Sequence, residues 1–293
     1  MADGNDATTD LGQARDEVVV GVDGSPGSHL ALDWAVANEA SLGPVVAVGA
    51  YHVDALVDGV GSTSMYDDMV DVLRRDAEAR VEEAVRRHPS LAGRGRVIQG
   101  YPGPGLVKAG TGQRLLVVGS RGRSALAETI LGSVASYCVK HSTVPVAVIP
   151  PGATAKAPLE HLIVGVDGSA NADAALAWAG EHVAPDGRIT AVTCRVPAPY
   201  ALELVPPPPL PFSQLQGVAE QAVARSIPDC EATVEIKVVD GDPRVALRDL
   251  ADEADLLVVG ARGHRGATYL LLGSVTTSLA HHPTVPTVVV PAE

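Results

Sequence analysis

Residues Val18–Val36 read VVVGVDGSPGSHLALDWAV, and a near copy, LIVGVDGSANADAALAWAG, stands at Leu162–Gly180. Each copy opens with an unbroken apolar run and continues, after a short turn, as a segment rich in alanine and leucine. Unbroken runs of this kind are typical of strands that are covered on both faces. A buried strand that leads into a helix is the building unit of a parallel α/β sheet.

Other segments repeat in the same order, which indicates duplication of a whole domain of about 140 residues rather than an array of short repeats. The repeated pairs are RLLVVGSRGR and DLLVVGARGH (Arg114–Arg123, Asp255–His264), LGSV twice (Leu131–Val134, Leu272–Val275), and HSTVPVAVIP and HPTVPTVVVP (His141–Pro150, His282–Pro291).

The sequence between the copies, PPGATAKAPLE, is rich in proline and alanine and has no apolar periodicity, so we place the domain boundary near Ala155. We expect a disordered tail over 1–16, a first domain over 17–151, a linker over 152–160 and a second domain over 161–293. Each domain is predicted to be a doubly wound α/β unit, a mostly parallel five-stranded sheet with helices on both faces.

In the first copy the expected strands are Val18–Val22, Val45–Tyr51, Gly95–Gln99, Leu115–Gly119 and Val146–Pro150. The expected helices are Pro26–Ser41, Met65–His88, Gly105–Thr111 and Gly132–His141. The second copy replaces part of the long middle helix with the proline-rich run Pro197–Phe212. We expect that run to be an extended surface segment, with a shorter helix over Gln214–Ala224.

Composition excludes several classes of function. The formal charge of −13 and an aromatic content of 3% argue against nucleic-acid and anionic-lipid partners. Three scattered cysteines favour neither a disulfide framework nor a zinc site. The start of the chain has no signal-peptide pattern, and no apolar run reaches the ~18 residues that a membrane span needs. We therefore expect a cytoplasmic protein.

Unusual residues follow the first and fourth strands of each copy, where open α/β sheets bind ligands. After the fourth strand the chain places three glycines and a serine at the same spacing twice. Glycines let the backbone approach an anion, and a helix that opens at Gly-Ser offers free N–H groups to a phosphate. The alternative is that these residues only form a turn and a helix cap. The residues are Gly119, Gly122, Gly132 and Ser133, and Gly260, Gly263, Gly273 and Ser274.

The charge of these loops also favours an anion, although a solvated charged loop is the plainer alternative. Between Gly119 and Ser133 the first copy has two arginines, Arg121 and Arg123, and one acid, Glu128. The corresponding stretch of the second copy has Arg262, His264 and Arg265 and no acid.

An aspartate ends the first strand in both copies, in the motif VDGS at Val22–Ser25 and Val166–Ser169. The carboxylates of Asp23 and Asp167 could bind the base or sugar of a nucleotide. They could equally form an Asx turn before the following helix. The two roles are compatible, because the serine can cap the helix while the aspartate binds.

Taken together, VGVDGS, LLVVGSRGR and LGSVASYCVKHSTVPVAVIP, present twice, resemble a tandem universal stress protein. In that family the pattern G-x2-G-x9-G-S/T after strand four marks the members that bind ATP. The resemblance implies one ATP site per domain, with Mg²⁺ as a companion of the phosphates, and a stress-response role. It also implies that Val144–Ile149 and Val285–Val290 join the halves as an internal pseudo-dimer. The implied contacts are Val22, Asp23, Ala50, Val118, Gly119, Arg121, Gly122, Gly132, Ser133 and Val134, and Val166, Asp167, Cys194, Val259, Gly260, Arg262, Gly263, Gly273, Ser274 and Val275.

Three functions stay open at this point. The first is a non-catalytic ATP-binding module, and the second is a slow ATPase or adenylate-using enzyme. The third is an interaction protein with an empty site. The sequence has no P-loop, HExxH, GxSxG or CxxC motif, and Cys194 is interpreted as a packing residue rather than a nucleophile. A homodimer beyond the internal pairing, the protein partners and the triggering stress are not determined by the sequence.

Overall fold

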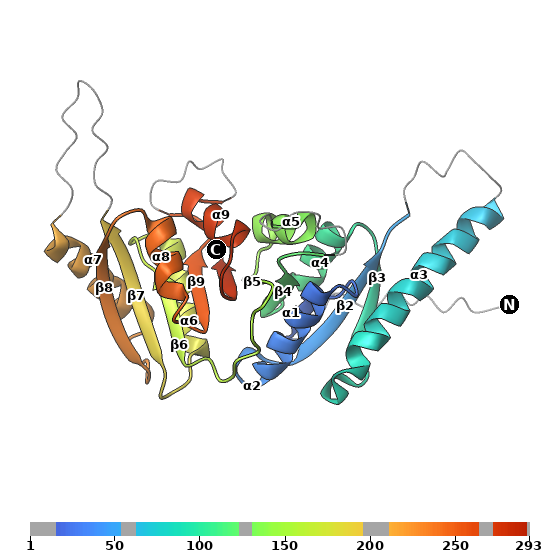
Figure 1. The fold of residues 1–293 in the computed structure, drawn as a ribbon, viewed down its shortest axis with the longest axis horizontal. Helices are drawn as coiled ribbons and strands as arrows, with labels where there is room; N and C mark the ends of the chain where they lie inside the picture. The colour runs from blue at the N-terminus through green and yellow to red at the C-terminus, as the bar shows by residue number, and fades with distance from the viewer. Residues whose placement is uncertain (1–15, 54–62, 123–130, 196–210, 264–271, 292–293) are drawn as a thin grey trace, which may run out of the picture.

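The structure, a computed structural model, describes residues 16–53, 63–122, 131–195, 211–263 and 272–291. Its centre is one ten-stranded sheet in the order β3-β2-β1-β4-β5-β10-β9-β6-β7-β8 (Figure 1). Every neighbouring pair is parallel except the central one, β5 and β10, which is antiparallel. Each half is thus a parallel five-stranded sheet, and the predicted α/β fold class is confirmed.

The strands are β1 (Val18–Gly21), β2 (Val45–Tyr51), β3 (Gly95–Gln99), β4 (Leu115–Gly119), β5 (Val146–Ile149), β6 (His161–Gly165), β7 (Arg188–Arg195), β8 (Thr233–Asp240), β9 (Leu256–Gly260) and β10 (Thr287–Val290). The helices are α1 (Pro26–Ala37), α2 (Glu39–Leu42), α3 (Thr63–Arg86), α4 (Pro102–Gly110), α5 (Ser133–His141), α6 (Ala170–His182), α7 (Phe212–Ser226), α8 (Pro243–Ala251) and α9 (Ser274–His281), with a 3₁₀ turn at Pro89–Leu91.

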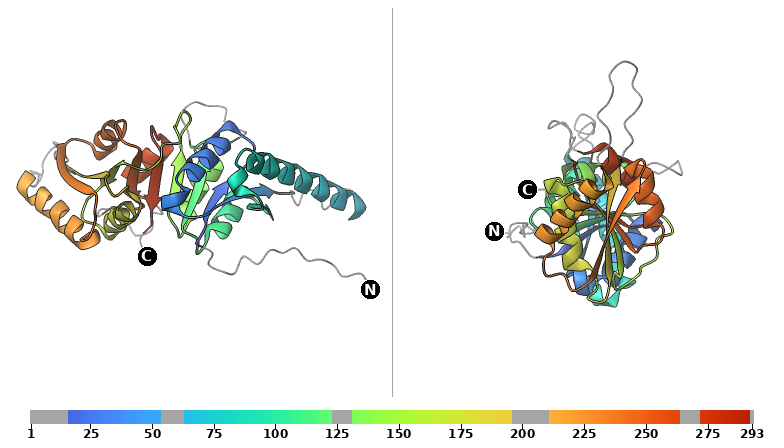
Figure 2. Two further views of the ribbon diagram at one scale, coloured as in Figure 1. Left: turned by 90° about the horizontal axis from the view of Figure 1, so that it is seen from below. Right: turned by 90° about the vertical axis from the view of Figure 1, so that its left-hand side faces the viewer.

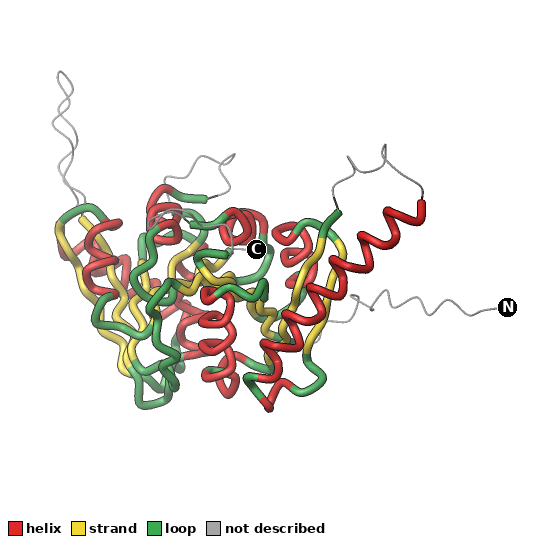
Figure 3. Tube along the Cα trace, turned by 45° about the vertical axis from the view of Figure 1, so that its right-hand side comes forward, coloured by secondary structure: helices red, strands yellow, loops and turns green. Residues whose placement is uncertain are grey.

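Helices cover both faces of the sheet, because side chains alternate between the faces along each strand. Val18 and Val20 belong to an apolar cluster with α1, α3, α6 and α7, whereas Val19 belongs to a second cluster with α4, α5, α8 and α9. Figures 2 and 3 show these two helical layers with the strands between them. The doubly covered sheet explains why the strands read as unbroken apolar runs.

The two halves share one core across the antiparallel pair. Ala147 of β5 lies opposite Val288 of β10, and both residues are completely buried. The first cluster contains both residues, and the second contains Val148 and Val289 from the same two strands. The expectation that the fifth strands join the halves internally is therefore confirmed.

The prediction of one continuous helix over Pro26–Ser41 was wrong. The helix is interrupted at Asn38, which separates α1 from α2. The amide of Asn38 is buried, and its Nδ2 donates to the carbonyl oxygens of Trp34 and Lys156, each at 3.0 Å. A side chain that bonds the preceding turn and the linker competes with the regular helix.

The helix predicted over Gly105–Thr111 begins earlier, at Pro102, since proline is tolerated in a first helical turn. Its glycines have a packing role rather than a weakening one. A β-carbon at Gly103 would lie 2.9 Å from the ring of Tyr137 on α5, and one at Gly105 would lie 2.8 Å from Ile98 on β3. The long middle helix, α3, begins and ends two residues earlier than predicted, and the helix after the proline run, α7, is two residues longer at each end. The expected tail and the run Pro197–Phe212 lie outside the described residues, apart from Asp16, Pro211 and Phe212.

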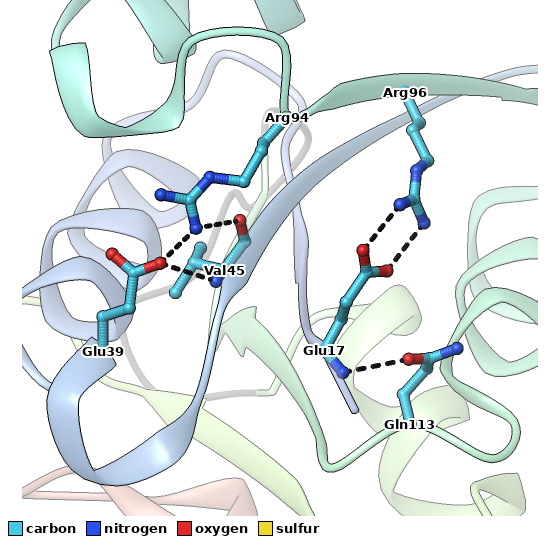
Figure 4. Close-up of polar contacts among 6 residues, drawn as sticks. All are labelled: Glu17, Glu39, Val45, Arg94, Arg96 and Gln113. Atoms are coloured by element: carbon cyan, nitrogen blue, oxygen red, sulfur yellow. Dashed lines mark hydrogen bonds and ion pairs between the residues drawn. The ribbon is translucent and has the colours of Figure 1, made fainter. Parts of the chain in front are cut away.

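Polar contacts fix the amino ends of the first-half strands, at the edge opposite the expected site (Figure 4). Arg96 forms two hydrogen bonds with Glu17, at 2.7 and 2.9 Å, and Arg94 pairs with Glu39 and donates to the carbonyl of Val45. The expected site lies at the other edge, where the carboxyl ends of the strands are found. None of the described helices is long and apolar enough to cross a membrane.

Candidate functional site

The turn after β1 is built by Asp23 and Ser25. The Oδ1 atom of Asp23 accepts from the Ser25 amide at 2.9 Å, with Gly24 at φ 79° between them. Ser25 is the N-cap of α1, and its Oγ accepts from the amide of Ser28 at 3.2 Å. The Asx turn considered from the sequence is therefore present, and it occupies one carboxylate oxygen of Asp23.

The second half repeats this turn. The Oδ1 atom of Asp167 accepts from the Ser169 amide at 3.0 Å, Gly168 has a φ of 80°, and the Ser169 Oγ accepts from the amide of Ala172 at 3.2 Å. The local geometry follows from the shared sequence VDGS, in which only glycine adopts the positive φ without strain.

The remaining carboxylate oxygen of each aspartate lies against the turn after the fourth strand of its half. A β-carbon at Gly122 would stand 2.8 Å from the Oδ2 atom of Asp23, and one at Gly263 would stand 2.4 Å from the Oδ2 atom of Asp167. The structure thus brings together the two segments that the sequence singled out, and glycine is what permits their contact.

The first glycine of each spaced set is explained by packing within the chain. A β-carbon at Gly119 would lie 2.6 Å from the backbone of Gly27, and one at Gly260 would lie 2.6 Å from the backbone of Asn171. These glycines let the end of the fourth strand touch the first turn of α1 or α6. Their presence is therefore no argument for a ligand.

The third glycine of each set is not explained in this way. Gly132 and Gly273 have φ values of −60° and −72°, which any residue adopts. A β-carbon there would meet its nearest neighbours at 3.4 and 3.5 Å, an ordinary van der Waals distance. Serine would also cap these helices better than glycine does. Nothing in the described chain requires glycine at these two positions, which are half-buried.

The first of these helices begins one residue later than the predicted range Gly132–His141. Gly132 and Gly273 are the N-caps, and Ser133 and Ser274 are the first helical residues, both exposed. The amide of Gly132 donates to the carbonyl of Ser120 at 2.8 Å, which ties the helix start to the turn after β4. The following N–H groups begin helices and have no partner within them.

The base side of the expected site lies at the ends of β2 and β7. The pairing of β1 with β2 and of β6 with β7 places Ala50 and Cys194 at equivalent positions. Burial, and then the charge of Asp242, raises the pKa of the Cys194 thiol to about 11. The thiol is protonated at neutral pH, which agrees with a packing residue and not with a nucleophile.

The predicted valines serve mainly to build the edge of the sheet. Val22, Val118, Val166 and Val259 are buried at the carboxyl ends of their strands. Val134 and Val275 are half-buried in the first turns of α5 and α9. Any ligand contact by these six residues is thus through the backbone or the edge of a side chain.

The arginines of the two loops differ in exposure. Arg121 is half-buried, with its carbonyl oxygen beside the first turn of α1, and Arg262 is exposed. Arg123, Glu128, His264 and Arg265 lie outside the described residues.

One neighbour of the site was missed by the sequence. The Arg80 side chain of α3 lies across the turn after β1, with its Cδ 3.2 Å from a β-carbon placed at Gly24, and it pairs with Asp76. The corresponding neighbour of Gly168 is Val218 of α7. Helical periodicity predicts α3 but does not show which of its side chains crosses this turn. No sequence pattern therefore predicted that Arg80 lies beside the first site and Val218 beside the second. Within the described ranges, no three His, Cys, Asp or Glu residues gather closely enough to hold a metal ion.

Two doubly wound halves, each with an acidic turn and a glycine-rich turn at the carboxyl edge of its strands, define a tandem α/β protein with paired candidate ligand sites. The chain belongs to the universal stress protein family, whose model matches residues 14–150 and again 158–291.

The chain is similar to whole tandem proteins of this family. A universal stress protein of Mycobacterium tuberculosis is 31% identical over 290 residues, which cover 93% of this chain and 96% of the relative. The crystal structure of a universal stress protein from Archaeoglobus fulgidus aligns with a TM-score of 0.68 and 22% identity, over 96% of this chain and 97% of that one. A universal stress protein solved in complex with cAMP aligns with 47% of this chain and all of its own, at 27% identity and a TM-score of 0.36.

Proposed function

We propose that each domain binds one ATP molecule at the carboxyl edge of its strands, and that the protein acts as a nucleotide-dependent module of the stress response. The observation that carries this proposal is the pair Gly132 and Gly273. Each begins a helix although neither its φ nor its contacts with the described residues demand glycine. A helix start with accessible N–H groups favours an anion, because unpaired donors and the helix dipole act together.

The proposed ligand lies across two turns. Its phosphates approach the amides that begin α5 or α9, beside Ser133 or Ser274. Its ribose and adenine lie toward Asp23 or Asp167 and the strand ends at Ala50 or Cys194. The two segments are close enough for one ligand, since the Oδ2 atoms of the aspartates lie against Gly122 and Gly263. Mg²⁺, where present, would be held by the phosphates.

Binding rather than turnover is proposed as the function. In both copies one oxygen of the aspartate accepts a hydrogen bond from the turn that caps the next helix, which is a positioning role. Turnover would require a general base that reaches the proton it removes, whereas these aspartates position a turn. We expect phosphate release from ATP to stay far below ~1 s⁻¹, a slow but ordinary enzymatic rate.

The proposal is tested by titrating the purified chain with ATP in a calorimeter, after mass analysis of any nucleotide released on denaturation. Asp23→Ala is expected to remove one of two equivalents and Asp167→Ala the other. The matched control is Ser25→Ala, which removes the cap of the same turn. It is expected to lower stability by about 1 kcal/mol and to keep both equivalents. Undiminished ATP binding by the double aspartate variant would refute the site.

A further inference from the structure

A cleft of about 440 Å³ lies where the two halves meet. The first half contributes the end of α5 and the residues that follow it, including Lys140, Ser142 and Thr143. The second half contributes Asn171, Arg262 and Pro291. Figure 1 shows α5 and α9 next to each other near the middle of the molecule, where the two halves meet. The volume is in the range of small-molecule sites.

The cleft carries positive charge in an acidic protein. Lys140 and Arg262 line it, and none of the described residues that form its wall is an aspartate or glutamate, although the whole chain has a formal charge of −13. Hydroxyl groups of Ser142 and Thr143 add hydrogen-bonding capacity, above a floor of valines. A cleft with this lining favours an anionic ligand.

The cleft shares two lining residues with the glycine-rich turn of the second domain's candidate site. Ala261 and Arg262 line it, and they are the two residues between Gly260 and Gly263 of the glycine-rich turn. It also reaches Pro291, directly after β10, and therefore lies at the carboxyl edge of the second-half strands. A ligand bound on the glycine-rich turn faces the first domain through this cleft.

The duplication offers an internal comparison. The position equivalent to Lys140 in the second copy is His281, as the paired segments YCVKHST and SLAHHPT show. Burial, followed by the charges of Lys140 and His282, lowers the pKa of His281 from its ordinary value of 6.5. The cleft beside the second domain's glycine-rich turn therefore has a lysine where the other copy has a histidine.

We propose that Lys140 of the first domain belongs to the second domain's site and binds the terminal phosphates of the nucleotide held there. This inference rests on the function proposed above and adds a residue from the other domain to it. It makes the second site dependent on the contact between the halves, and it makes the two sites unequal for nucleotides with more than one phosphate.

The test uses the full chain with the first site disabled by Asp23→Ala, titrated with ATP and with AMP. Lys140→Ala is expected to weaken ATP about tenfold, the usual scale for losing a charged hydrogen bond, and to leave AMP unchanged. Lys140→Arg is expected to restore ATP affinity. Lys108→Ala, which removes an exposed lysine that does not line the cleft, is the matched control and is expected to leave the second site unchanged.

Salt gives a further readout, because Lys140 is exposed. The difference in ATP affinity between the parent protein and its Lys140→Ala variant is expected to shrink as ionic strength rises from 0.01 M to 1 M. Over this range the Debye length falls from about 30 Å to about 3 Å. Equal ATP affinity in Lys140→Ala and its parent, while Asp167→Ala abolishes binding, would overturn this inference alone. An equal loss for AMP would also overturn it. Absence of ATP binding by the unmodified chain would overturn the proposed function as well.

Discussion

Glycines with the same spacing in the sequence have different roles in the structure. Gly119 allows the end of β4 to touch the backbone of α1, whereas no contact with the described residues requires glycine at Gly132. The sequence suggested that all these glycines form one ligand-binding set. Only the contacts around each Cα show which of the glycines the packing requires. Asp23 shows the same limit, because its motif predicted both an Asx turn and a ligand contact, and the structure shows the turn.

Substitution at these two glycines is expected to separate stability from binding. Gly119→Ala places a methyl group 2.6 Å from the backbone and is expected to cost about 1–3 kcal/mol in the free energy of unfolding. Gly132→Ser is expected to keep or raise stability, because serine caps a helix well. It is also expected to weaken ATP, because its hydroxyl competes for the same amides. Denaturant unfolding and calorimetric titration of both variants check this. Loss of stability without loss of ATP affinity in Gly132→Ser would contradict it.

At the scale of single elements, α1 and α6 end differently although they are the corresponding helices of the two copies. The buried amide of Asn38 follows α1, and the equivalent position in α6 is His182, which is 8% exposed and stacked on Trp178. The imidazole Nδ1 lies 2.7 Å from the Trp178 carbonyl oxygen. Burial lowers the pKa of His182 from its ordinary value of 6.5, outweighing the bond to Trp178, which acts in the opposite direction.

This shift makes stability depend on pH in a defined direction. Well above pH 6.5 the imidazole is neutral in both the folded and the unfolded chain, so it has no pH effect there. Below that pH the unfolded chain takes up a proton that the folded chain resists, and stability falls until the lower folded pKa is reached. His182→Asn, which installs the first-half residue, is expected to flatten the loss of stability between about pH 7 and 5. Denaturant unfolding at several pH values measures it, and an unchanged slope would contradict the assignment.

The strands were predictable to within a residue, since buried apolar runs between turns carry a strong signal. The helix ends were less predictable, because tertiary contacts determine them. Asn38 donates to the linker carbonyl of Lys156, and α4 starts at Pro102, where its glycines pack against α5 and β3. The turns of the candidate site were predictable from their motifs. Arg80 and Lys140 were not, because their places depend on how helices and halves pack against each other.

At the scale of the whole molecule, the antiparallel pair β5–β10 makes one folding unit of two duplicated domains. Both apolar clusters run across this pair. The unmodified chain is therefore expected to unfold in a single calorimetric transition. The same junction places Lys140 beside the second domain's loop, so the proposed ligand contact and the fold depend on the same interface.

Val288→Asp tests the shared core, because it puts a carboxylate at a fully buried position opposite Ala147. We expect a loss of several kcal/mol and a separation into two thermal transitions, since an unpaired charge in a core is strongly unfavourable. The control is Val245→Asp on α8, where the valine is 54% exposed, and there we expect a change within about 0.5 kcal/mol. A single transition at the original Tm in Val288→Asp would contradict a continuous core.

The most direct test of the central claim is the number of ATP molecules bound per chain, measured by calorimetric titration of nucleotide-free protein. The unmodified chain is expected to bind two, and the double variant Gly132→Ser, Gly273→Ser to bind ATP more weakly at both sites while keeping its fold by circular dichroism. Two equivalents at unchanged affinity in the double variant, or no binding by the unmodified chain, would contradict it.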